Sequence, residues 1–120
     1  MKETCQKCHS TSQVQSYYKG AEAVLGSMNE FVSKASDVIK KLRADGLLTP
    51  DPFDEPIELL YFDLWHYGGR TAKHGAFMSG ADFVQWHGFY DVYNKSRELA
   101  RMADELRKEK GHAASKAAAR

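Results

Sequence analysis

Apolar residues recur every seven positions along the first third of the chain, in two interleaved series. The series are Val14, Ala21, Met28, Ala35 and Leu42, and Tyr18, Leu25, Val32 and Ile39. Such series place a continuous apolar seam along one side of a helix. We therefore predict one long helix over residues 12–44 that packs against another long helix. Asp45 and Gly46 should end it, because basic residues fill its last turn and a glycine follows.

The remainder of the chain also has a helical pattern, divided by breakers. All three prolines fall in residues 45–56, which predicts a rigid connection. A short helix is expected over 56–67, since Pro56 suits a first helical turn. Gly68 and Gly69 should break or kink it, at the start of a histidine- and aromatic-rich segment, 68–80. Val92, Leu99 and Leu106 recur at seven and predict a second long helix over 81–110.

These elements predict an all-α fold. The helical domain, residues 12–110, should contain two long helices packed antiparallel and a short third helix. No stretch alternates apolar and polar residues, so we expect no strand. Residues 1–11 form a separate segment at the N-terminal end, and 111–120 are expected to be a flexible tail. His112 lies in that tail, and we assign it no role.

Charge and hydropathy exclude two classes of partner from the prediction. The 120 residues include 17 basic and 16 acidic ones, so the balance favours no nucleic-acid interaction. No stretch is long and apolar enough for a membrane span. Residues 1–10 also lack the basic start and apolar run of a secretory signal. Either a leader has been removed, or the chain is part of something longer, or the protein stays in the cytoplasm.

The only two cysteines stand in the motif CQKCH, which contains Cys5, Cys8 and His9. C-x-x-C-H is the attachment signature of c-type haem: the thiols add to the porphyrin vinyl groups, and the shared helical turn brings the histidine to the iron. A zinc site would need a distant fourth ligand. A thioredoxin-like redox pair expects a preceding strand, and a disulfide closing so short a loop would stabilise little. The adjacent histidine favours haem.

Three further histidines, His66, His74 and His87, lie among aromatic residues and glycines. Each alone would be an ordinary hydrogen-bonded histidine, but three together in a chain with a haem motif favour distal ligation of iron. The helical period places His87 roughly opposite His74, so the three would serve separate partners. Gly75 and Gly88 are expected to let a porphyrin approach the backbone. Met78 is a further candidate ligand, although a methionine at that spacing is more often in the core.

Several stretches resemble the C-terminal part of the octahaem hydroxylamine oxidoreductase (HAO) family. They are CQKCH, WHYGGR and HGAFMSGADFVQWHG, with a long helix after the first and a charged helix after the last. The resemblance covers about residues 3–108, and only the last portion of the family's length. C-x-x-C-H is shared by all c-type cytochromes, so the specificity lies in HGAFMSGADFVQWHG.

The resemblance implies a periplasmic protein whose parent carries eight haems, with the other attachment motifs and the signal peptide upstream. Cys5 and Cys8 would carry the thioether bonds of one haem c, and His9 would be its proximal ligand. The same three histidines, His66, His74 and His87, would be candidate distal ligands, in part to haems attached elsewhere. The implied partners are other haem-bearing segments of the parent, a redox partner cytochrome, and two further copies in a trimer.

Members of the family that oxidise hydroxylamine or hydrazine bond a tyrosine of this region to the catalytic haem of a neighbouring subunit. The matching position is Phe83, with Tyr90 as the fallback. Phenylalanine has no hydroxyl, so the resemblance implies the reductive branch, which acts on nitrite or hydroxylamine. The chain itself offers no catalytic residues, and would be an oxidoreductase only within the larger assembly.

Three functions therefore compete. The first is electron transfer through covalent haem within a multihaem nitrogen-cycle enzyme. The second is a haem-free helical oligomerisation module, which the heptad seam and the charged terminal helix would serve. The third is a zinc or redox-thiol protein built on the two cysteines.

Overall fold

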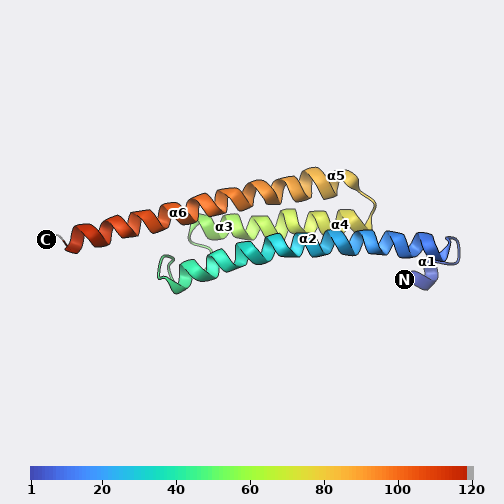
Figure 1. The fold of residues 1–120 in the computed structure, drawn as a ribbon, viewed down its shortest axis with the longest axis horizontal. Coiled ribbons are helices and arrows are strands. Elements are labelled where there is room, and N and C mark those ends of the chain that lie inside the picture. Colours follow the sequence, from blue (N-terminus) through green and yellow to red (C-terminus); the bar gives the residue numbers. More distant parts are fainter. Residues whose placement is uncertain (119–120) are drawn as a thin grey trace.

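Three helical rods lie side by side in the computed structural model, which describes the backbone of residues 1–118 and the side chains of residues 1–110 (Figure 1). The first rod is α2 (Thr11–Ala44), preceded by the short α1 (Lys2–Cys5). The middle rod joins α3 (Pro56–Asp63), the π-helical turn η1 (Leu64–Gly69) and α4 (Arg70–Phe77). The third rod joins α5 (Ala81–Val84), a second π-helical turn η2 (Gln85–Tyr90) and α6 (Asp91–Ala118). No strand occurs in residues 1–118, which confirms the all-α fold with long helices.

The two long helices run in the same direction, so the predicted antiparallel packing of this pair is wrong (Figure 1). Phe31 of α2 contacts Phe89 of the third rod, and the Lys110 ammonium near the end of α6 donates to the carbonyl of Gly46, just after α2. The reason is the middle rod. Its helix continues through Gly68 and Gly69, and is therefore long enough to carry the chain back along the bundle.

The predicted seam of α2 forms the core of the bundle. Its buried members are Val14, Ala21, Met28, Ala35, Ile39 and Leu42. Met28, Ala35, Ile39 and Leu42 share one core cluster with a second buried set from the other rods, Ile57, Leu64, Ala72, Val92, Leu99 and Ala103. Fully burying a large aliphatic side chain contributes about 1.5–3 kcal/mol, so the seam is the main source of the bundle's stability.

Both ends of α2 have the caps that their sequences suggest. The Ser10 hydroxyl accepts a hydrogen bond from the N–H of Gln13 at 3.2 Å. At the other end Gly46 has φ +64°, and the N–H of Leu47 donates back to the carbonyl of Leu42 at 2.9 Å. Only glycine adopts this left-handed backbone without strain, so it closes the helix in a Schellman motif.

The third rod is longer than expected. Helix α6 continues to Ala118, through most of the range for which we predicted a flexible tail. The tail is rich in alanine, the best helix former, and its helix extends that of α6 without a break. The side chain of His112 lies outside the described residues.

The chain is elongated, with extents of 76 × 23 × 20 Å. Its radius of gyration is 19.7 Å, against roughly 14 Å for a compact domain of this length. None of the helices in the described part of the chain combines the length and the apolarity needed to cross a bilayer.

A buried carboxylate fastens the proline-rich connection to the bundle. The side chain of Glu58 is only 3% exposed and forms an ion pair with Arg43 of α2. Its second oxygen accepts the N–H of Phe53 at 2.9 Å, a residue whose φ of +63° is unfavourable for a side chain of its size. The pair thus joins α2, the connection and α3.

Replacing Glu58 with alanine should lower the free energy of unfolding by about 2 kcal/mol, because the charge-assisted hydrogen bond from Arg43 is lost and the part-buried N–H of Phe53 loses its acceptor. Urea denaturation followed by circular dichroism measures the change. Glu109→Ala, at an exposed position on α6, should change stability by less than about 0.5 kcal/mol. Equal effects of the two substitutions would contradict this role of Glu58.

Candidate haem-attachment site

The CQKCH motif forms a helical turn at the end of α1. The N–H groups of Cys8 and His9 both donate to the carbonyl of Cys5, at 3.2 and 3.0 Å. Both cysteines are free thiols; Cys5 is half-buried and Cys8 is exposed. The two thiols and the imidazole therefore follow one another along a single turn, each with access to whatever lies beside it.

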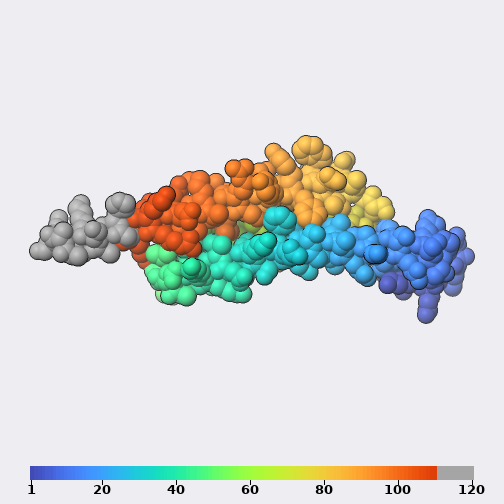
Figure 2. Space-filling view, viewed as in Figure 1, coloured from blue at the N-terminus to red at the C-terminus, as the bar shows by residue number. Residues whose placement is uncertain are grey.

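A cavity of about 420 Å³ adjoins this turn. The start of α2 projects beyond the α4–α5 turn (Figures 1 and 2), and the cavity lies in this corner of the molecule. Its lining residues are Cys5, His9, Gln13, Val14, Tyr17, Tyr18, Phe77, Met78 and Ser79. Thiol, imidazole and thioether groups thus share a cavity whose other walls are mainly aromatic and apolar.

Two tyrosines of α2 form one wall and hold the cavity together. The Tyr17 hydroxyl donates to the carbonyl of Phe77, which ties α2 to the end of α4. The Tyr18 ring packs edge-on against the rings of Tyr17 and Phe77, at centroid distances of 5.5 and 6.1 Å. Burial raises the pKa of Tyr18, and negative charge on Cys5 raises it further. Tyr18 therefore stays a neutral phenol beside the motif.

The opposite wall is the turn that ends α4. Ser79 has φ +54°, and the N–H of Gly80 donates to the carbonyl of Gly75 at 2.8 Å, as in a Schellman motif. This turn leaves Met78 78% exposed at the mouth of the cavity. The expectation that Met78 belongs to the core was therefore wrong, because the helix ends at Phe77 and directs the chain outward.

His66 is held by its own helix. Its ring stacks on Phe62 at 4.6 Å, with 14° between the ring planes, and Trp65 meets it edge-on at 5.2 Å. Its Nε2 lies 3.0 Å from a guanidinium nitrogen of Arg70. Arginine can only donate, so Nε2 is the acceptor and the ring proton sits on Nδ1. An iron ligand at Nε2 would have to displace Arg70.

His74 and His87 are both exposed, on the middle and third rods. The ring of His87 leans against Phe83 at 5.8 Å. The structure brings neither of them, nor His66, to the cavity beside CQKCH. Within residues 1–110, no three His, Cys, Asp or Glu side chains lie close enough together to hold a metal ion. The described residues therefore offer no set of ligands for the zinc site considered above.

The glycines after these histidines serve the packing of the chain itself. A Cβ on Gly75 would lie 2.7 Å from the Cβ of Phe83, and one on Gly88 would lie 2.5 Å from the Cβ of Ala72. Real Cβ atoms do not approach so closely, so only glycine lets the middle and third rods cross here. The expectation that these two glycines make room for a porphyrin is corrected: protein atoms of this chain fill that space.

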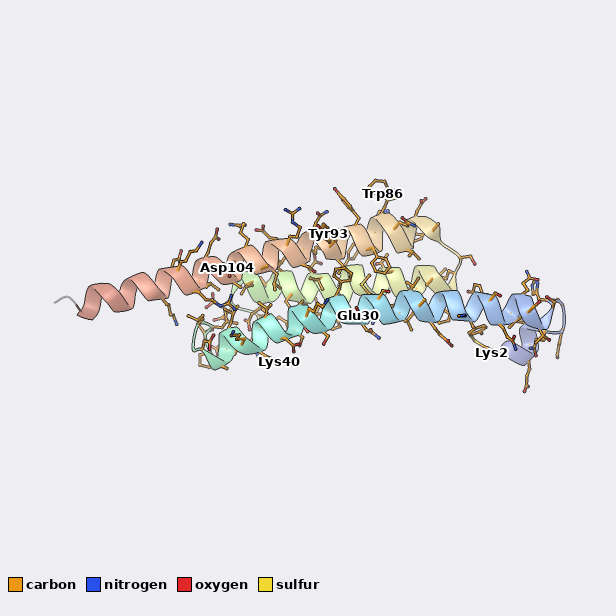
Figure 3. All side chains as sticks on the ribbon, in the orientation of Figure 1. Lys2, Glu30, Lys40, Trp86, Tyr93 and Asp104 are labelled. Atoms are coloured by element: carbon orange, nitrogen blue, oxygen red, sulfur yellow. The ribbon has the colours of Figure 1, made fainter. Side chains whose placement is uncertain are left out.

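A stripe of exposed rings, which the sequence patterns above did not single out, runs along the third rod. We call it the aromatic stripe; it consists of Phe83, Trp86, Tyr90 and Tyr93, which are 51–64% exposed. Figure 3 shows Trp86 and Tyr93 pointing away from the other two rods. The four residues are spaced by three, four and three positions, and the rings of Trp86 and Tyr90 meet edge-on at a centroid distance of 5.4 Å. That spacing is visible in the sequence, and could have separated this exposed face from the buried seam.

The residues beside the cavity fit a covalently bound haem. Two free thiols on one turn, an imidazole next to them and an apolar, aromatic cavity are the groups that a haem c would use. No residue outside this corner supplies a second pair of thiols, since the sequence contains only two cysteines.

No family model matches the chain, and no protein of curated function matches it. Among solved structures, the chain superposes on a chain of the Kuenenia stuttgartiensis reducing HAO-like protein complex with a TM-score of 0.86. The alignment has 20% sequence identity and covers 95% of this chain but only 33% of the other. The chain therefore shares its fold with about a third of a protein from an HAO-like complex.

Proposed function

We propose that this chain carries one haem c and transfers electrons as part of an HAO-like multihaem assembly. The observation that carries the proposal is the corner of the molecule where the free thiol of Cys5 and the imidazole of His9 line an aromatic-walled cavity, with the free thiol of Cys8 on the same helical turn. The thiols would form the thioether bonds, and His9 would be the proximal ligand. When bound, the haem supplies one-electron oxidation and reduction of its iron.

The protein's own contribution is to hold and cover that group. The helical turn of CQKCH fixes the spacing of the two thiols and the imidazole. The tyrosine wall and Phe77 would shield one side of the porphyrin from water, and the Tyr17 hydroxyl keeps that wall in place by its bond to α4. Burial and the groups near the iron set a haem's potential, so this wall should tune electron transfer as well as retain the haem.

The larger assembly is inferred from the structural likeness and the sequence resemblance together. The chain spans about a third of the length of the structure it matches, which belongs to a reducing HAO-like complex. We propose that other haem-bearing segments act with it on hydroxylamine, hydrazine or nitrite in the periplasm, with a cytochrome as redox partner. Phe83 is 56% exposed and has no hydroxyl, which favours the reductive direction if it occupies the cross-linking position.

A spectroelectrochemical titration tests the electron-transfer role. The full chain, produced with a periplasmic leader and the cytochrome c maturation machinery, should be red and should titrate reversibly with one electron per chain. A colourless chain that binds stoichiometric zinc, or that cycles between dithiol and disulfide, would support the thiol alternative and contradict this proposal.

A second candidate function, helical assembly, is favoured by the surface of the chain. The chain exposes 8306 Å², whereas a compact monomer of its mass exposes roughly 6,500 Å². The aromatic stripe adds four large exposed rings, and exposed apolar surface of this kind marks interaction sites. We propose that this face is covered in the assembly, by a second copy in a trimer or by a haem-bearing segment.

Trp86→Glu tests the assembly role, because a charge on the stripe cannot be buried without cost. Self-association of the chain, measured by sedimentation equilibrium, should weaken at least tenfold. Lys34→Glu, at an exposed position on α2, is the control. If both variants associate as the unsubstituted chain does, the stripe is not the interface between copies.

A further inference from the structure

We propose that Lys95 is a positioning residue. It joins the third rod to the middle rod so that η1 keeps its π-helical form, and this form fixes the direction of the His66 ring. We call Lys95, Asp63, Asp91 and Tyr67 the Lys95 clamp. The inference goes beyond the proposed function, because it concerns the conformation of this chain and needs no haem.

The Lys95 ammonium binds two carboxylates from different rods. Its Nζ lies 2.5 Å from Oδ2 of Asp63 and 2.9 Å from Oδ2 of Asp91. The ring of Tyr67 lies beside the same ammonium, with its centroid at 5.4 Å. The Lys95 side chain is only 18% exposed. Burial lowers the pKa of Lys95, but the hydrogen bonds to both carboxylates outweigh this effect and raise the pKa overall, so the group stays charged.

The clamp acts where π-helical and α-helical backbone meet. Asp63 is the last residue before η1, and Asp91 is the first residue after η2. Within η1, a Cβ on Gly68 would lie 2.6 Å from the Asp91 oxygen that Lys95 binds, so this carboxylate rests against the η1 backbone. Lys95 therefore holds η1, directly or through Asp91, on both sides of His66 in the sequence.

A π-helical turn is rare in proteins, and it takes up one residue more than an α-helical turn. Conversion of η1 to α-helix would rotate the residues after it by about 100° relative to α3. That rotation would separate Gly68 from Asp91, or Asp63 from Lys95. The clamp opposes the rotation because it holds both ends of the turn, so we expect η1 to lose its π form when the ammonium is removed.

The direction of the His66 ring depends on η1. The ring stacks on Phe62 of α3 at 4.6 Å, and its Nε2 accepts from Arg70 of α4 at 3.0 Å. Phe62 and Arg70 lie on opposite sides of η1 along the chain, so both contacts need the geometry of this turn. Lys95 thus positions His66 without touching it. In the proposed assembly the ring would be preorganised for a partner segment, and this consequence alone rests on the proposed function.

Nuclear magnetic resonance of the full chain tests the clamp through the His66 ring. Ring protons stacked on the face of Phe62 should resonate upfield, and His66→Gln identifies them by their disappearance. Lys95→Met keeps a long side chain but removes the ammonium, and should abolish the upfield displacement. Lys95→Arg can still bind two carboxylates and should preserve it. Asp63→Asn, at an exposed position, should reduce the displacement, and it decides the matter if Lys95→Met does not fold.

Arg97→Met is the matched control. Arg97 lies on the same helix, but its guanidinium lies over the ring of Tyr93, at 5.9 Å, and not over η1. It should leave the His66 signals unchanged. Unchanged signals in Asp63→Asn, or in a folded Lys95→Met, would overturn the inference, as would an equal change in Arg97→Met.

The outcome is independent of the haem proposal. No residue of the clamp lines the cavity beside CQKCH, so folded Lys95→Met should carry as much covalent haem as the unsubstituted chain. A chain without haem whose His66 signals respond as expected would contradict the proposed function and support the clamp. A haem-loaded chain whose His66 signals do not respond would do the reverse.

Discussion

The double variant Cys5→Ser/Cys8→Ser should contain no covalent haem after co-production with the cytochrome c maturation machinery. A serine hydroxyl cannot form the thioether bonds, and the chain has no other cysteine. The mass of the denatured protein measures the effect, because only covalently bound haem survives denaturation. We expect the full mass increment of one haem in the unsubstituted chain and none in the double variant.

The single variants should differ in how much covalent haem they retain and in how that haem is ligated. Cys5→Ser and Cys8→Ser each keep one thiol on the turn, so each should retain a smaller fraction of haem through one thioether bond. His9→Ala should fail to give the low-spin spectrum, since the proximal ligand is lost. His66→Gln, away from the cavity, is the control and should be loaded fully. Haem that survives denaturation of the double variant would place the attachment elsewhere.

The second large effect is expected at Gly88. A methyl group there would overlap the Cβ of Ala72 at 2.5 Å and the carbonyl oxygen of Phe83 at 2.7 Å. Both contacts involve backbone or backbone-attached atoms that cannot rotate away, so the rods must separate. Overpacking of this kind costs about 3 kcal/mol. Gly88→Ala should lower the free energy of unfolding by that amount in urea denaturation.

Gly20 provides a matched control within the same chain. It lies in the interior of α2, and a Cβ at that position would have nothing within 4 Å. Gly20→Ala should therefore stabilise the chain by about 0.5–1 kcal/mol, because alanine loses less conformational freedom in a helix. If the two substitutions had similar effects, the close crossing of the middle and third rods would be contradicted.

The helices were predictable from the sequence because their information is local and periodic. The seven-residue series from Val14 to Leu42 and from Val92 to Leu99 marks the residues that the bundle buries. The glycine at position 46 marks the end of α2 for an equally local reason, its positive φ. In each case the physical cause lies within a few residues of the signal.

The direction of the third rod was not predictable in this way. Gly68 and Gly69 looked like breakers, since isolated glycines weaken helices. In the structure they belong to η1, where a Cβ on Gly68 would lie 2.6 Å from a carboxylate oxygen of Asp91. Their function is to let two rods approach, and this depends on a partner helix that the local sequence does not reveal.

The candidate site likewise has one part that could be predicted from the sequence and one part that could not. The motif CQKCH is contiguous, so its helical turn could be anticipated. The cavity beside it joins residues 5–18 to residues 77–79, and no periodicity relates these segments. The histidines were conspicuous in the sequence, whereas the structure places Met78 beside the motif. Spatial proximity across the bundle is therefore the part of the site that the sequence pattern did not reveal.

The measurement that tests the central claim most directly is a pyridine haemochrome spectrum of the purified chain after acid-acetone extraction. The account predicts one haem per chain that resists extraction, with the band position of a haem bound through two thioether bonds. A soluble, helical chain without extraction-resistant haem would contradict the account, and the protein would then be a helical assembly module without the cofactor.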